Sequence, residues 1–185
     1  KHDADIIDFS SVQQKNMYSL FPKVESWKNV IKNLITLISY PVLRKRYNDF
    51  QKFIDDEFVK TSKSFDSFEQ LKELDGEFDV LICGSDQIWN LNCTDFDDAY
   101  FLGFDTEARK VAYAVSLGGQ NIINSPDVQK YQRYLEDFDY ISVRERNGQG
   151  WISQLTDKNV EIVADPTLLV EREKWESLVK EPDIQ

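Results

Sequence analysis

Cysteine and long apolar runs are scarce in this sequence of 185 residues, and each scarcity argues against a class of protein. The two cysteines, Cys83 and Cys93, have neither the spacing of a metal-binding pair nor a disulfide-rich context, so we expect reduced thiols and no metal site. No apolar stretch approaches the ~20 residues that cross a bilayer, and no segment joins a basic start to an apolar run and a small-residue cleavage site. These absences favour a cytoplasmic protein.

Positive charge is also in short supply. The 22 Lys and Arg residues face 33 Asp and Glu residues, which gives a net charge of −11 at pH 7. A negative surface repels phosphate backbones and anionic membranes, so we expect no nucleic acid partner. The length suits one domain with a single core, because a chain of this size buries roughly 70% of the surface that its unfolded form exposes.

The second half of the chain alternates short apolar strands with helices. Strands are predicted at 78–83, 109–117, 140–144 and 160–164, and helices at 127–138 and 147–155. This alternation is typical of a mostly parallel sheet that helices cover on both faces. The sequence therefore predicts an α/β, Rossmann-like domain.

The first half of the chain is predicted to be mainly helical. A short strand within residues 1–9 precedes apolar residues at three- and four-residue spacing over 24–38, and Pro41 suits the first turn of a second helix. A third helix is expected from Asp66, where Glu69 completes a capping box. A helical insertion over about residues 20–75 is longer than a crossover between strands needs, which leaves two uses open: a lid, or a surface for a homo-oligomer.

Polar residues follow three of the predicted strands. Gly84-Ser85-Asp86-Gln87 follows the first, Ser116-Leu117-Gly118-Gly119 the second and Arg144-Glu145 the third. Open α/β sheets hold their ligands at the carboxyl ends of the strands, so these groups are expected to converge on one edge. The sequence therefore predicts a ligand site there.

The same residue types have structural roles that the sequence leaves open. The guanidinium of Arg144 can grip a carboxylate or phosphate through two N–H groups, or it can form a salt bridge. The candidate salt-bridge partners are Glu145, Asp86 and Asp165. Asp86 can instead cap a helix, Gly118 can simply form a turn, and Asp165 is expected in a capping turn.

Four segments, taken in order, carry a family pattern. They are residues 78–90 (FDVLICGSDQIWN), 113–118 (YAVSLG), 141–145 (ISVRE) and 163–169 (VADPTLL). Together they resemble the polysaccharide pyruvyl transferase family. The resemblance implies the amino-terminal half of a two-domain, glycosyltransferase-like (GT-B-like) fold. Residues 1–170 would form the Rossmann-like domain without its first strand, and 171–185 a helix that leads towards an absent carboxyl-terminal domain.

The resemblance also implies an activity. Similar proteins transfer the pyruvyl group of phosphoenolpyruvate onto two sugar hydroxyls, without a cofactor, to form a cyclic ketal in bacterial cell-surface polysaccharide biosynthesis. By the resemblance, Arg144 binds the phosphoenolpyruvate anion, Asp86 orients or deprotonates the acceptor, and Glu145 is a third catalytic candidate. The substrate-binding residues would be Gly84, Ser85, Gln87, Asn90, Ser116 and Gly118, together with Arg144.

The expected partners are phosphoenolpyruvate and an acceptor that is a sugar or a lipid-linked glycan. Other cationic residues of the family, including a histidine and an arginine, belong to the second domain, and the only histidine here is His2. We therefore expect this transferase to be inactive as the 185-residue chain alone. Two alternatives stay open: a nucleotide-sugar glycosyltransferase of similar fold, and a catalytically silent interaction domain.

Overall fold

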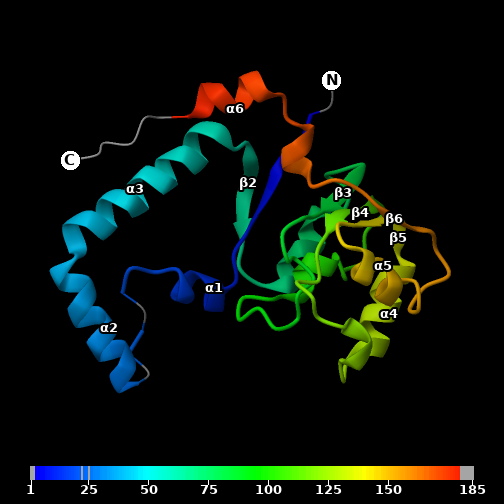
Figure 1. Cartoon of the computed structure of the whole chain (residues 1–185), viewed down its shortest axis with the longest axis horizontal. Coiled ribbons are helices and arrows are strands. Elements are labelled where there is room, and N and C mark those ends of the chain that lie inside the picture. Colours follow the sequence, from blue (N-terminus) through cyan, green and yellow to red (C-terminus); the bar gives the residue numbers. More distant parts are fainter. Residues whose placement is uncertain (1–2, 22, 25, 180–185) are drawn as a thin grey trace. The chain divides into compact units, whose positions relative to one another are not determined.

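The computed structural model describes residues 3–21, 23–24 and 26–179. The chain is a mixed α/β structure with parallel sheets and helices on both sides (Figure 1). It divides into two compact units, Lys1–Glu73 and Leu74–Gln185. Within the described ranges, no helix is both long and apolar enough to span a membrane.

Two predicted elements extend past the described ranges. The first strand was expected from residue 1 and begins at Ile6, while residues 1–2 lie outside the described residues. The last helix was expected within 171–185 and is observed over Arg172–Leu178, while residues 180–185 lie outside the described residues.

A two-stranded parallel sheet joins segments of the first unit that are far apart in the sequence. Strand β1 (Ile6–Phe9) pairs with β2 (Lys60–Phe65), and the amide of Asp8 donates a hydrogen bond to Thr61 Oγ1 at 3.1 Å. The helices between these strands are α1 (Val12–Met17), α2 (Trp27–Ile38) and α3 (Tyr40–Glu57). The periodicity correctly predicts α2 and α3, and Pro41 lies in the first turn of α3.

The third helix predicted near Asp66 is present, but it is a short 3-10 helix and not an α-helix. The chain forms β2 and then a 3-10 helix, η1 (Phe68–Leu74). The amide of Asp66 donates to Oε1 of Gln70 at 2.9 Å, so this reciprocal bond uses Gln70 and not Glu69. The sequence does not predict strand β2, because its residues are mostly polar and it pairs with a strand that is distant in the sequence. The contact between Asp8 and Thr61, for example, joins residues 53 positions apart.

A four-stranded parallel sheet in the order β3-β4-β5-β6 forms the centre of the second unit (Figure 1). Its strands are β3 (Val80–Cys83), β4 (Arg109–Val115), β5 (Phe138–Val143) and β6 (Val160–Ile162). The helices of this unit are α4 (Val128–Glu136), α5 (Arg146–Ile152) and α6 (Arg172–Leu178), with 3-10 helices η2 (Asp98–Phe101), η3 (Ile122–Asn124) and η4 (Pro166–Leu169). All paired strands of this sheet run in the same direction, as predicted, so their carboxyl ends share one edge.

Aromatic side chains fill the core beside this edge. Trp89 is fully buried, stacks on Phe101 with ring centroids 4.4 Å apart, and meets Phe138 edge to face at 5.7 Å. The indole N–H of Trp89 donates to the carbonyl of Tyr100 at 3.0 Å, which satisfies its one polar atom. Trp89 is therefore a core residue that anchors the loop after β3.

Candidate functional site

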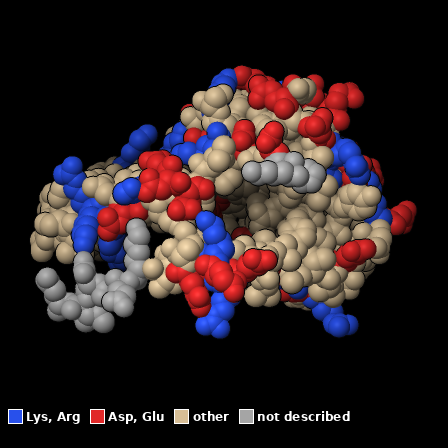
Figure 2. Space-filling model, turned by 90° about the horizontal axis from the view of Figure 1, so that it is seen from above, with Lys and Arg blue, Asp and Glu red and all other residues tan. Residues whose placement is uncertain are grey.

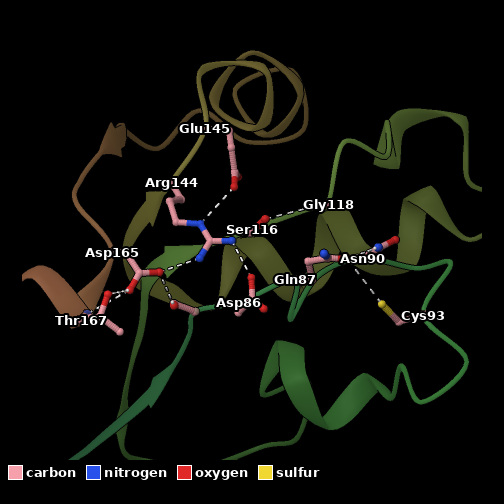
Figure 3. Close-up of polar contacts among 11 residues, drawn as sticks. Asp86, Gln87, Asn90, Cys93, Ser116, Gly118, Arg144, Glu145, Asp165 and Thr167 are labelled. Atoms are coloured by element: carbon pink, nitrogen blue, oxygen red, sulfur yellow. Dashed lines mark hydrogen bonds and ion pairs between the residues drawn. The ribbon is translucent and has the colours of Figure 1, made fainter. Parts of the chain in front are cut away.

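The loops that follow the strands are tied together by backbone hydrogen bonds. The amide of Ser116 donates to the carbonyl of Ser85 at 3.0 Å, and the amide of Trp89 donates to the carbonyl of Ser116 at 3.1 Å. The amide of Arg144 donates to the carbonyl of Val115 at 3.1 Å. These bonds fix the loops after β3, β4 and β5 side by side at the carboxyl edge of the sheet (Figure 3).

Arg144 lies at the centre of this edge and contacts three carboxylates. Its Nε donates to Glu145 Oε1 at 3.1 Å, and one terminal nitrogen donates to Asp165 Oδ2 at 2.6 Å. The other terminal nitrogen donates to Asp86 Oδ1 at 2.7 Å (Figure 3). The sequence offered these carboxylates as alternative partners, and the structure uses all of them at once. We call Arg144, Asp86, Glu145 and Asp165 the arginine cluster.

The three carboxylates of the arginine cluster differ in exposure. The side chain of Asp86 is 77% exposed, compared with 36% for Glu145 and 22% for Asp165. Asp165 is also held by the hydroxyl of Ser85, which donates to its Oδ2 at 3.2 Å. Asp86 is therefore the most accessible partner of the guanidinium, and Asp165 is the most shielded.

The charges in the arginine cluster do not balance, because one cation faces three carboxylates. Hydrogen bonds from the guanidinium to Asp86, then Asp165, then Glu145 raise the pKa of Arg144 above its ordinary value. The hydroxyl and amide of Thr167, followed by Arg144, lower the pKa of Asp165 below its ordinary value. The cluster as a whole is negative, so an anionic ligand needs further cations or the displacement of a carboxylate.

Gly84 lets the loop after β3 pass very close to β4. A Cβ atom at Gly84 would lie 2.1 Å from the carbonyl oxygen of Tyr113. Strand β4 is irregular at this point: Ala114 has a φ of 50°, and Ser142 Oγ donates to the carbonyl of Ala112 at 3.0 Å and accepts from the amide of Ala114 at 3.1 Å. The missing side chain of Gly84 thus makes room for protein backbone.

Gly118 makes room for two amide side chains. Its φ is +59°, and a Cβ there would lie 2.5 Å from Asn90 Nδ2 and 2.8 Å from Gln87 Oε1. Asn90 Nδ2 donates to Gln87 Oε1 at 2.8 Å, and the amide of Gly118 donates to Ser116 Oγ at 3.2 Å (Figure 3). The sequence-predicted residues therefore form two groups: Ser85 joins the arginine cluster, while Gln87, Asn90, Ser116 and Gly118 pack together beside it.

A comparison with protein-family models matches residues 1–185 to the family described as polysaccharide pyruvyl transferase. The chain belongs to the polysaccharide pyruvyl transferase family. No curated protein and no solved structure matches the chain. In this pyruvyl transferase family member, the segments that resemble the family motifs follow β3, β4, β5 and β6 and meet at one edge of the sheet.

Asp165 has a second role besides the capping turn that the sequence predicts. Its Oδ1 accepts from the amide of Thr167 at 2.9 Å and so caps η4, as expected of a capping turn. Its other oxygen binds Arg144, which makes Asp165 part of the site as well. The available signal was its position after the fourth parallel strand, at the same edge as the other polar groups.

Cys93 is a second residue that sequence reasoning left outside the site. Its Sγ lies 3.9 Å from Oε1 of Gln87, next to the pair formed by Gln87 and Asn90 (Figure 3). In the part of the chain that the structure describes, no group of His, Cys, Asp and Glu residues is arranged to hold a metal ion. The carboxylate oxygens of the arginine cluster instead surround a guanidinium.

Proposed function

We propose that this family member transfers pyruvyl from phosphoenolpyruvate to two hydroxyls of a sugar in bacterial cell-surface polysaccharide biosynthesis. The observation that carries the proposal is the guanidinium of Arg144, held by the less exposed Glu145 and Asp165 and covered on its remaining edge by the exposed Asp86. A planar guanidinium presents paired N–H donors that match a carboxylate or phosphate.

In the proposed mechanism, the carboxylate or phosphate of the donor displaces Asp86 from Arg144. Asp86 is the partner best suited to leave, because it is highly exposed and its contact with Arg144 is a single ion pair. Once released, its carboxylate accepts the proton of an acceptor hydroxyl. Glu145 and Asp165 keep the guanidinium in place during this exchange.

The reaction balances without an oxidant or a reductant. The methylene carbon of the donor gains a proton and becomes the methyl group, which makes the central carbon electrophilic. Two carbon–oxygen bonds form from that carbon to the sugar, and its bond to the phosphate oxygen breaks. The two sugar hydroxyls lose two protons in total. The methyl group gains one proton, and the released phosphate carries the other.

The negative charge of the arginine cluster means that the donor needs additional cations. The family resemblance implies that such residues lie in a second domain, and we propose that it faces this edge of the sheet in the intact protein. Under this proposal the 185-residue chain alone releases no phosphate from phosphoenolpyruvate. The proposed compartment is the cytoplasm, and the proposed acceptor is a sugar or a lipid-linked glycan.

A catalytically silent interaction domain is the second candidate, and one observation favours it. The guanidinium of Arg144 is bonded through all three of its nitrogens to protein, and the spaces beside Gly84 and Gly118 are also filled by protein atoms. A silent domain needs no exchange at Asp86. A test of function must therefore measure whether the protein turns over a donor and whether that turnover depends on Arg144.

The test is an assay of the intact protein with phosphoenolpyruvate and a glycan acceptor in heavy water. Pyruvyl transfer gives one phosphate per ketal and a methyl group that contains one solvent deuterium. Arg144→Lys keeps the charge but loses the planar fork, so we expect a loss of about 10- to 100-fold in kcat/KM for the donor. Arg109→Lys is the matched control, because Arg109 begins β4 at the opposite edge, where its partner is Asp139 at 3.5 Å.

Each alternative has its own outcome in this assay. Turnover of a nucleotide sugar, with phosphoenolpyruvate ignored, would assign the protein to the glycosyltransferases. Absence of turnover with any donor would favour the silent domain. Equal activity of the two lysine variants would remove Arg144 from the donor site.

A further inference from the structure

Helix α2 turns its apolar face outward. Trp27 is 69% exposed and Ile38 is 85% exposed, whereas Thr36 on the opposite face is buried at 6%. The other apolar residues of the helix that are exposed are Val30, Ile31, Leu34, Ile35 and Leu37. A surface helix normally places its apolar stripe against the protein, so this face is suited to contact with something else.

The apolar residues of α2 form one continuous face. At about 100° per residue, positions 27, 31, 34 and 38 lie within a narrow arc, and 30, 35 and 37 flank it. The polar residues Asn29 and Asn33 lie on the other side and are partly buried. Helix α2 has 12 residues, which is too short to span a bilayer but long enough to lie along its surface.

Positive charge is concentrated in the stretch of sequence that contains this apolar face. Residues 26–48 contain no Asp or Glu, although the whole chain has a net charge of −11. The cations in this stretch are Lys28 and Lys32 on α2 and Arg44, Lys45 and Arg46 near the start of α3. Figure 2 views the molecule from above and shows Lys and Arg side chains at its left, together with uncharged surface and acidic side chains.

We propose that α2 and the first turns of α3 dock on an anionic lipid surface. An apolar helix face bordered by lysine and arginine is the pattern by which interfacial helices bind negatively charged membranes. Trp27, Tyr40 and Tyr47 add side chains that favour the boundary between lipid and water. The proposal is independent of the pyruvyl transfer proposed above.

A second copy of the chain fits this surface less well. A two-fold dimer places the same patch of each copy against the other, so Lys28 and Lys32 of one copy would lie close to the same residues of its partner. The negative charge of the rest of the chain does not prevent docking, because salt screens charges that lie more than about 8 Å from the membrane at physiological ionic strength. The local positive charge then determines the attraction.

Vesicle binding by the full chain tests the proposal. We expect it to bind vesicles of 30% phosphatidylglycerol and 70% phosphatidylcholine, to bind pure phosphatidylcholine far less, and to dissociate as salt is raised. Each cation near an anionic surface contributes about fivefold in affinity, so Lys28→Gln with Lys32→Gln should weaken binding roughly 20- to 30-fold. The matched control is Lys72→Gln with Lys174→Gln, which removes the same charge from exposed positions elsewhere.

A second variant tests the apolar face. Ile35→Ser with Ile38→Ser changes two exposed side chains, which should preserve the fold by circular dichroism and reduce binding to the anionic vesicles at least tenfold. Equal binding to both kinds of vesicle, or equal effects of the two lysine pairs, overturns the proposal. A dimer in sedimentation that the isoleucine variant dissociates, without vesicle binding by the wild type, would instead make this face a self-association surface.

Discussion

Replacing Asp86 by asparagine separates its proposed role as a base from a purely structural role. Asparagine has nearly the same size and keeps an oxygen that can accept from Arg144, but it cannot take up a proton at neutral pH. Because the Asp86 side chain is 77% exposed, the lost ion pair should cost only about 0–1 kcal/mol of unfolding free energy. Loss of a general base costs about 100-fold or more in kcat, or roughly 3 kcal/mol and upwards in transition-state stabilisation. The kinetic effect should therefore far exceed the effect on stability.

The exchange at Arg144 adds a second expectation for this variant. Asp86 competes with the donor for one edge of the guanidinium, and a neutral asparagine competes less well. The KM for phosphoenolpyruvate should therefore stay the same or fall while kcat falls. A group that only helped to bind the donor would raise KM instead.

The measurement is the initial rate of phosphate release by the intact protein, at saturating donor with varied acceptor and then the reverse. Asp157→Asn is the matched control, because Asp157 is exposed in the turn before β6 and the change removes the same charge. Thermal denaturation of both variants establishes that they fold. If Asp86→Asn keeps the kcat and the KM of the wild type, Asp86 is neither the base nor the competitor of the donor.

Three smaller predictions concern stability and reactivity. Gly84→Ala should lower the free energy of unfolding in urea by about 3 kcal/mol or more, because the new Cβ would meet the backbone of β4. The control Gly150→Ala in α5 has open space at the new Cβ, so it should be neutral or stabilising by up to ~1 kcal/mol. Equal effects of the two variants would show that the loop after β3 does not need glycine to pass close to β4. Burial raises the pKa of the Cys83 thiol, so alkylation at pH 8 followed by mass spectrometry should label Cys93 and spare Cys83. The folded-state pKa of Asp165 lies below its ordinary value, so the ionised carboxylate stabilises the fold above about pH 4, and this stabilisation is lost on further acidification. The difference in Tm between the wild type and Asp165→Asn should therefore disappear as the pH is lowered through that range. A difference in Tm that does not change with pH would contradict this reasoning.

The sequence predicts the carboxyl edge of the sheet well, because strand pattern and strand direction are local or nearly local properties. Apolar runs that end in polar residues locate β3, β4 and β5, and the predicted helix between β4 and β5 favours a parallel pair. The same logic brings Asp86 and Arg144 together although 58 positions separate them. Much of the candidate site at the carboxyl edge of the sheet can therefore be predicted from the sequence alone.

Other features depend on contacts that no local pattern encodes. The polar strand β2 exists because β1 offers a partner, and the irregular part of β4 exists because the hydroxyl of Ser142 satisfies it. The spacing of apolar residues in α2 correctly predicts a helix. It does not determine whether the apolar or the polar face packs against the rest of the protein. The number of carboxylates around Arg144 is likewise set by the three-dimensional arrangement of separate loops.

Asp165 gives the fold a mechanical linkage between its last helices and the site. One oxygen of its carboxylate fixes the start of η4 through Thr167, and the carbonyl of Thr167 accepts from the indole N–H of Trp175 in α6 at 3.1 Å. The other oxygen holds Arg144. A displacement of α6 would pull on η4 and turn the carboxylate that orients the guanidinium. The segment that follows β6 is thus coupled to Arg144 through Asp165, so a displacement of Trp175 would be transmitted to the guanidinium.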